Sequence, residues 1–165
     1  MSELSDAPAP LSVLIPVKNE AANMRDCISG VSFADEIVVV DSASTDGTQA
    51  IAEGAGARVV QFVWNGYVPR KKNWALENIP WQHEWLLIVD ADERITPELE
   101  REIRRAIRRT DVDGFYLNRR FWFLGGWINY CGYFPSWNLR LFRHRLARYE
   151  QIEINNSAQA GDNEV

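Results

Sequence analysis

The sequence predicts an α/β fold with a mostly parallel central sheet flanked by helices. Short apolar runs at 11–17, 36–41 and 85–90 each end in polar or acidic residues, and each precedes a segment with helical spacing. Strands that alternate with helices in this way build parallel sheets. The polar residues that close the strands should therefore gather at the carboxyl edge of the sheet, where ligands bind in such folds.

Length and composition set the outer limits of the protein. The 165 residues, 46% of them hydrophobic, can bury one core. We expect a flexible leader at 1–10, one domain over 11–150 and a disordered tail at 151–165. A net charge of −5 argues against a nucleic-acid partner.

Targeting signals and cysteine spacing indicate the compartment. The N-terminus lacks a secretory pattern, and no window holds 18 uninterrupted apolar residues. We therefore expect a cytoplasmic protein, either soluble or attached to the inner face of the cytoplasmic membrane. Cys27 and Cys131 lack metal-ligand spacing, and we expect free thiols rather than a disulfide.

The elements follow in order from the hydrophobic pattern. The run at 11–17 suits a strand buried on both faces, and Asn19 is expected to cap the helix that follows. Thr96 and Pro97 predict another helix start, since threonine caps and proline suits the first helical position. The remaining expected elements are strands at 36–41, 58–64, 85–90, 113–123 and 138–144, a loop at 46–48 that enters a helix, a helical segment over 69–79, and an aromatic loop at 125–137.

Two acidic residues end the most apolar strand. Asp90 and Asp92 are separated by one residue, so both carboxylates can face a cavity at the sheet edge. Hard oxygen ligands at such an edge suit Mg²⁺ or Mn²⁺. The alternative is an ordinary pair of acids at a turn and helix start.

Two further strand ends carry polar residues. Asp41 closes the strand at 36–41, and its carboxylate can accept hydrogen bonds from a nucleobase or ribose, unless the loop after it is only turn chemistry. Pro16 fixes the backbone that leaves the first strand, and Glu20 can bond a ribose or base. Of the basic residues Arg70, Lys71 and Lys72, we expect Lys72 or Arg70 to point inward toward a pyrophosphate; the alternative is a solvated helix face.

The order of these clusters resembles a known family. The set PVKNE at 16–20, DSASTDGT at 41–48, the basic segment at 69–77 and DADE at 90–93 is similar to the family 2 glycosyltransferases with a GT-A fold, over residues 11–145. Within that family, WLLIVDADERITPEL and the later WNLRLFR most resemble the bacterial lipopolysaccharide-core glucosyltransferase type.

The resemblance implies a metal-assisted, inverting transfer of a hexose from a nucleotide-diphosphate sugar, a UDP-sugar first of all, to a cell-envelope saccharide or lipid-linked acceptor. It implies a Rossmann-like, nucleotide-sugar-binding GT-A fold, and Mg²⁺ or Mn²⁺ as cofactor. The nucleotide-sugar site would comprise Pro16, Val17, Asn19, Glu20, Asp41, Ser44, Asp46, Lys72, Asp90 and Ala91, with Asp92 as the metal ligand.

The general base is the missing part of this assignment. Family members carry it well downstream of the DxD motif, where this chain offers only Glu150 and Glu153. The acceptor part therefore looks incomplete, and a nucleotide-sugar-binding module without turnover is the alternative. A nucleotidyltransferase would need a Gly-rich loop that the first strand lacks, and Glu93-Arg94 does not fit a DxD phosphohydrolase.

An aromatic and cationic stretch follows the last predicted helix. Trp and Tyr residues over 121–134 lie near five arginines and indicate a membrane-interface or glycolipid-acceptor surface. The alternative is that Phe121, Phe123 and Trp137 fill the core. The arginines are Arg119, Arg120, Arg140, Arg143 and Arg145.

Overall fold

The computed structural model describes residues 7–64, 66, 70–123, 126–128 and 135–149. In chain order the elements are β1 (Ala9–Val17), α1 (Ala21–Gly30), β2 (Ala34–Asp41), α2 (Thr48–Gly54), β3 (Arg58–Gln61), α3 (Lys71–Asn78), β4 (Trp85–Ile88), α4 (Pro97–Ala106), β5 (Gly114–Arg119), β6 (Phe121–Phe123), β7 (Gly126–Ile128) and β8 (Ser136–Arg143).

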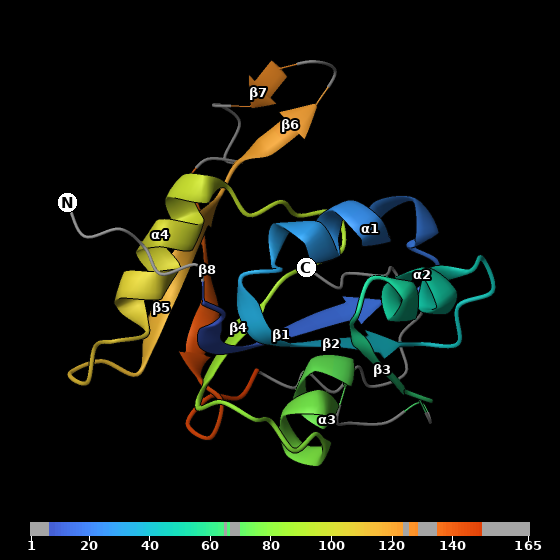
Figure 1. Cartoon of the computed structure of the whole chain (residues 1–165), viewed down its shortest axis with the longest axis horizontal. Coiled ribbons are helices and arrows are strands. Elements are labelled where there is room, and N and C mark those ends of the chain that lie inside the picture. The colour runs from blue at the N-terminus through green and yellow to red at the C-terminus, as the bar shows by residue number, and fades with distance from the viewer. Residues whose placement is uncertain (1–6, 65, 67–69, 124–125, 129–134, 150–165) are drawn as a thin grey trace, which may run out of the picture.

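Six strands form the central sheet in the order β3-β2-β1-β4-β8-β5 (Figure 1). β3, β2, β1 and β4 are parallel, whereas β8 runs antiparallel between β4 and β5. The predicted α/β class and the mostly parallel sheet are confirmed. From β1 the chain adds β2 and then β3 on one side of the sheet, whereas β4 pairs with the other side of β1. The direction in which strands are added therefore reverses between β1 and β4. Ligands of open α/β sheets bind outside the carboxyl ends at such a reversal.

Apolar side chains on the two faces of the sheet form two cores. Met24 and Cys27 of α1 and Ile103 of α4 pack with Val13 and Ile15 on one face. On the opposite face, α3 packs against alternate residues of the same strands, among them Leu14, Val38 and Leu86. Figure 1 shows α1 and α2 on one side of the sheet and α3 on the other. β1 is therefore buried on both sides, as its continuous apolar run predicts.

The third strand is shorter than predicted. The expected strand at 58–64 ends at Gln61, and Val63 and Trp64 are exposed. The register explains the difference: Gln61 pairs with Asp41, the last residue of β2. Phe62 N–H donates to the Asp41 carbonyl oxygen at 2.8 Å and β2 ends at that residue, so apolar content alone does not extend the ladder.

The other boundaries differ in detail. β1 begins at Ala9, inside the expected leader 1–10. The strand expected at 113–123 divides into β5 and β6. The prediction of an aromatic loop over 125–137 is wrong at 126–128, where β7 pairs with β6 in an antiparallel hairpin. In the same way β8 starts at Ser136, two residues before the expected strand at 138–144.

The helix start at Thr96 is confirmed. The Thr96 side chain accepts a hydrogen bond from the Leu99 N–H at 3.3 Å, and Pro97 occupies the first helical turn. Glu98 and Glu100 in the first turn and Arg104 and Arg105 in the last complement the helix dipole.

Candidate functional site

The carboxyl edge of the parallel strands carries the predicted site residues. Val17 at the end of β1 pairs with Asp41 of β2, which pairs in turn with Gln61 of β3. The loops after β1, β2 and β4 therefore leave the sheet side by side. The predicted site residues at this edge lie as much as 76 positions apart in the sequence, from Pro16 to Asp92.

The loops after β1 and β2 are joined by hydrogen bonds. The backbone N–H groups of residues 19–21 donate to the side chains of the second loop: Asn19 to Ser44 Oγ at 2.7 Å, Glu20 to Thr48 Oγ1 at 2.8 Å, and Ala21 to Asp46 Oδ2 at 3.0 Å. In return, Thr45 N–H donates to Asn19 Oδ1 at 2.9 Å. The two loops thus form one cross-linked surface.

The prediction that Asn19 caps α1 is wrong. Glu20 occupies the cap position, where its side chain makes no cap hydrogen bond. Asn19 instead has a φ of 58°, a left-handed conformation that asparagine tolerates better than most residues. Its side chain is turned to Thr45, so it ties the two loops together rather than starting the helix.

Asp41 is buried and fully engaged within its own loop. Its Oδ2 accepts from Ser44 N–H at 3.1 Å and from Gln61 Nε2 at 3.0 Å, and its Oδ1 accepts from the Ser44 hydroxyl. The turn chemistry that the sequence analysis gave as the alternative is therefore present, with Asp41 bonded to Ser44. A nucleoside contact by Asp41 remains a prediction.

Asp46 shapes the entry to α2. Its Oδ1 accepts from Thr48 N–H at 3.0 Å and from the Thr48 hydroxyl, and these bonds together with the Ala21 N–H hold the pKa of Asp46 below its ordinary value of 3.8. Gly47 has a φ of 91°, a conformation that glycine adopts without a Cβ penalty. The DGT sequence at 46–48 thus forms the predicted loop that leads into a helix.

The start of α3 brings two lysines to the edge. Lys72 Nζ lies 3.3 Å from Asp90 Oδ1, in agreement with the prediction that Lys72 points inward. Lys71 also turns inward, which the sequence reasoning missed: it is buried, and its Nζ donates to the carbonyl oxygen of Val17 at 3.1 Å. Arg70 is half-buried at the cap position of α3.

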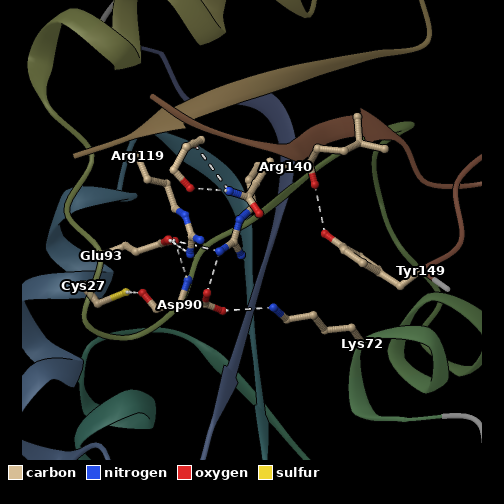
Figure 2. Close-up of polar contacts among 10 residues, drawn as sticks. Cys27, Lys72, Asp90, Glu93, Arg119, Arg140 and Tyr149 are labelled. Carbon is tan, nitrogen blue, oxygen red and sulfur yellow. Dashed lines mark hydrogen bonds and ion pairs between the residues drawn. The ribbon is translucent and has the colours of Figure 1, made fainter. Parts of the chain in front are cut away.

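Asp90 lies at the centre of a charged network (Figure 2). Arg140 Nη2 donates to Asp90 Oδ2 at 2.6 Å and to Glu93 Oε1 at 3.0 Å, while Asp90 N–H donates to Glu93 Oε2 at 2.9 Å. Arg119 Nη1 approaches Glu93 Oε1 at 3.4 Å. Burial alone would raise the pKa of Asp90, but the Arg140 hydrogen bond and the charges of Lys72 and Arg140 outweigh it and hold that pKa below 3.8. Asp90 is therefore ionised at neutral pH.

Arg140 has a different role from the one expected. The sequence grouped it with the cationic residues of a membrane-facing surface, but its side chain is 4% exposed. Arg140 lies on β8, 50 residues after Asp90 in the sequence. The sequence pattern that could have indicated its role is the WNLRLFR motif. Arg119 is likewise turned to Glu93 rather than to solvent.

Asp92 and Ala91 differ in exposure. Asp92 is exposed at the edge and Ala91 is buried beneath it. Within the described ranges no group of three or more His, Cys, Asp or Glu side chains is arranged to hold a metal. A Mg²⁺ or Mn²⁺ ion at this edge would take its further ligands from the oxygens of a bound phosphate and of water, as Mg²⁺ commonly does beside substrate phosphates.

The buried Cys27 and the half-buried Tyr149 lie next to the network. Cys27 is a free thiol whose Sγ contacts the Asp90 carbonyl oxygen at 3.7 Å, and burial raises the pKa of this thiol to about 12. Burial also raises the pKa of Tyr149 to about 12; its hydroxyl donates to the Leu139 carbonyl oxygen at 3.0 Å, and its ring lies 5.7 Å from Lys72 Nζ. The candidate bases Glu150 and Glu153, and Cys131, lie outside the described residues.

The aromatic surface is described only in part. Tyr116 and Trp137 are 63% and 61% exposed, so Trp137 does not fill the core, while Phe121 is half-buried under Arg119. The side chain of Phe123 lies outside the described part. Among the helices in that part, none has the length and apolar content needed to cross a bilayer.

The sequence and the fold are similar to those of known proteins. Residues 12–160 match the model of glycosyl transferase family 2. The chain is 34% identical over 152 residues to the lipopolysaccharide core biosynthesis glycosyltransferase LpsC of Rhizobium meliloti, and 44% identical over 106 residues to an uncharacterised glycosyltransferase of Rickettsia bellii. These alignments cover 86% and 64% of the chain, but 53% and 35% of the relatives' own lengths, so the chain spans about half or less of each.

Solved structures show the same fold. Staphylococcus aureus TarS (residues 1–349) superposes with a TM-score of 0.53 and 28% identity, over 64% of this chain and 34% of that one. The mannosyltransferase PcManGT of Pyrobaculum calidifontis, in a complex with GDP-mannose and Mn²⁺, superposes with a TM-score of 0.50 and 24% identity, over 72% of this chain and 39% of that one. With the family model matching most of its length, the chain belongs to glycosyl transferase family 2.

Proposed function

We propose that this chain carries the donor half of a glycosyltransferase that moves a hexose from a nucleotide-diphosphate sugar, a UDP-sugar first of all, to a cell-envelope saccharide or lipid-linked acceptor. The observation that carries the proposal is the ion pair of Lys72 with Asp90 where the strand order reverses, with the exposed Asp92 two residues further along the same loop. A diphosphate needs positive charge, and a metal that bridges it needs an exposed carboxylate. Both are supplied at this edge.

The cross-linked loops after β1 and β2 form the nucleoside side of the proposed site. Pro16, Val17, Asn19 and Glu20 leave β1 next to the loop of Asp41, Ser44 and Asp46. Base and ribose recognition depends on fixed donors and acceptors, and the hydrogen bonds between the loops hold these groups in place before a ligand arrives. Preorganisation of this kind lowers the cost of binding.

The diphosphate side lies between α3 and the loop after β4. Lys72 reaches Asp90 from the first turn of α3, and Asp92, two residues further along the loop after β4, is exposed. A divalent metal, when bound through Asp92, would neutralise the charge that develops on the leaving diphosphate. Lys72 would offset part of the same charge, and Asp90, ionised and held by Arg140, is suited to accept hydrogen bonds from ribose hydroxyls.

An acceptor and a general base complete the proposed reaction. Similarity to LpsC supports a lipopolysaccharide-core or related envelope saccharide as acceptor. The exposed rings of Tyr116 and Trp137 suit contact with a glycolipid or membrane surface, in keeping with a location at the inner face of the cytoplasmic membrane. Glu150 is the proposed base, in a segment beyond the described residues.

A donor-binding module without turnover is the second candidate. It is favoured by one observation in the described part of the chain: Glu93, the carboxylate that follows the DxD motif, is occupied by Arg119 and Arg140. A residue held by two guanidinium groups is poorly placed to accept a proton from an acceptor hydroxyl. Under this alternative the chain binds the nucleotide sugar but does not complete the transfer.

Calorimetric titration tests the donor site directly. UDP, UDP-glucose and GDP are each titrated into the 165-residue chain, with and without Mn²⁺. We expect Mn²⁺-dependent binding of a nucleoside diphosphate that is weakened in Asp41→Asn. Asp35→Asn is the matched control, because Asp35 lies at the opposite end of the same strand, exposed beside His83. Failure of all three ligands to bind with Mn²⁺ would exclude the proposed donor site.

A second assay separates the two candidate functions. The chain is incubated with a bound UDP-sugar and a cell-envelope glycolipid fraction, and released UDP is measured. Release that requires the acceptor supports the transferase. Tight binding with no release supports the binding module.

A further inference from the structure

We propose that Arg140 is a positioning residue of this site, inserted by a β-bulge in β8 so that its guanidinium fixes the Asp90–Glu93 turn in its ligand-ready shape. This inference rests on the proposed function and deepens it. Its evidence comes from the register of β8, the contacts of the guanidinium and the packing behind the turn.

The bulge is visible in the pairing of β5 with β8. Phe115 pairs with Leu141 but Tyr116 pairs with Leu139, so Arg140 is an extra residue on β8. Leu141 accordingly packs in the core below α1 and α4, whereas Leu139 packs on the opposite face. Without the extra residue, both leucines would point to the same face. Bulges commonly redirect a side chain next to a functional site.

The redirected guanidinium closes a ring of contacts. Its Nη2 joins Asp90 Oδ2 and Glu93 Oε1, and Glu93 Oε2 accepts the Asp90 N–H. The side chain and backbone of Asp90 are thereby held through the same two partners. Figure 2 shows this ring, with Lys72 reaching Asp90 from the other side. Such a ring restricts both the rotamer of Asp90 and the path of the turn that leads to Asp92.

Burial of the Arg140 guanidinium carries a desolvation cost. The side chain of Arg140 is 4% exposed, and its Nη1 is buried without a hydrogen-bond partner among the described residues. A buried charged group with an unsatisfied donor calls for an explanation. Positioning of the turn supplies one, because the Arg140 guanidinium contacts the carboxylates of both Asp90 and Glu93.

The back of the turn is closed by Cys27. Its Sγ contacts the Asp90 carbonyl oxygen at 3.7 Å, and the residue is 1% exposed. If Arg140 holds the turn in place, loss of Arg140 loosens the turn and opens a path to this thiol. The reactivity of Cys27 therefore reports on the turn without any nucleotide.

The experiment compares Arg140→Met with Arg143→Met. Arg143 is the matched control: it lies on the same strand and pairs with Glu84 and Asp113, but at the opposite end of β4. Each variant is titrated with UDP and Mn²⁺, and its melting temperature is measured. We expect Arg140→Met to bind UDP about tenfold more weakly, which corresponds to the loss of one charged hydrogen bond. Arg143→Met should bind UDP with wild-type affinity even if its melting temperature changes.

Thiol labelling provides the second readout. In a Cys131→Ser background, Cys27 is the sole cysteine of the chain. Its reaction with an aromatic disulfide reagent should be about tenfold faster in Arg140→Met than in Arg143→Met, following the increased population of the open turn. Arg140→Lys keeps the charge without the planar fork, so a change of about threefold is expected, and this variant serves if Arg140→Met does not fold.

The outcomes are distinct. Wild-type affinity and wild-type labelling in both Arg140 variants would overturn the positioning role. If the wild-type chain binds no nucleotide, the proposed function fails, and faster labelling in Arg140→Met still establishes that Arg140 fixes the turn. Equal labelling in the Arg140 and Arg143 variants would refute even that.

Discussion

Lys72 Nζ lies 3.3 Å from Asp90 Oδ1, so an ion pair connects the first turn of α3 to the end of β4 across the carboxyl edge of the sheet. The two residues are partly buried, and the Tyr149 ring lies against the ammonium group. This pair places a positive charge where the proposed diphosphate would lie. It also leaves Asp90 with a partner on each side, Lys72 and Arg140.

Replacement of Lys72 tests the diphosphate contact. Lys72→Met should weaken UDP binding about tenfold, because a charge-assisted contact to a phosphate oxygen is lost. Uridine, which lacks the diphosphate, should bind the variant and the wild type alike. Arg101→Met is the control, since it removes a positive charge from the exposed face of α4. Equal UDP affinity in Lys72→Met and wild type would count against this role.

Asp92→Asn tests the metal. The variant keeps the shape of the side chain but removes the exposed charge at the edge. We expect its affinity for UDP in the presence of Mn²⁺ to fall to the metal-free value of the wild type, because a neutral amide is a much weaker ligand for a hard cation. Calorimetry with and without Mn²⁺ measures the difference.

The matched control for Asp92→Asn is Asp111→Asn, which removes an exposed carboxylate paired with Arg109 after α4. It should leave Mn²⁺-dependent binding unchanged. A Mn²⁺ effect that survives in Asp92→Asn would show that the metal is held elsewhere.

Acid should weaken the loop held by Asp46. The pKa of Asp46 lies below 3.8 because of its bonds to Thr48 and Ala21, so the carboxylate contributes stability above the ordinary pKa, and this contribution is lost as pH falls through the lower folded value. Asp46→Asn should therefore melt below the wild type at pH 7, with the gap closing in acid. Melting curves from neutral pH to about pH 2.5 measure this gap. Asp26→Asn, at an exposed site on α1, should show no such convergence.

The cap of α4 should contribute measurable stability. Thr96→Ala removes the acceptor for the Leu99 N–H, and we expect a loss of about 1 kcal/mol in the free energy of unfolding. Urea denaturation provides the value. Thr110→Ala, in the exposed segment after α4, is the control and should change stability by much less.

Glu36 should affect stability without affecting the site. This buried residue accepts from Ser12 Oγ, from Arg58 Nη2 at 3.0 Å and from Gln82 N–H at 3.0 Å, at the amino-terminal side of the sheet. Glu36→Gln should lower the free energy of unfolding by about 2 kcal/mol, as expected for a charged hydrogen-bond acceptor. UDP affinity should stay at the wild-type value. A parallel loss of affinity would mean that the two edges of the sheet are coupled.

Much of the fold was predictable from local pattern. Continuous apolar runs identified β1, β2 and β4, since strands buried on both faces lack alternation. The Thr96-Pro97 pair located the start of α4, because capping depends on residues within one turn. The end of β3 was not predictable, since it depends on where its neighbour β2 ends.

The sequence by itself determined which residues close the parallel strands. Asp41, Asp90 and Asp92 follow apolar runs, and parallel strands bring their carboxyl ends to one edge whatever the loops between them. Only the tertiary structure decided the partners of these residues. Lys71 was not among the lysines and arginines expected to point inward, and Arg140 was grouped with a membrane-facing surface, yet Lys71 bonds the Val17 carbonyl oxygen and Arg140 bonds the Asp90 carboxylate. The physical reason is that a bulge and a sheet register set the direction of Arg140, and both arise from pairing between strands far apart in the chain.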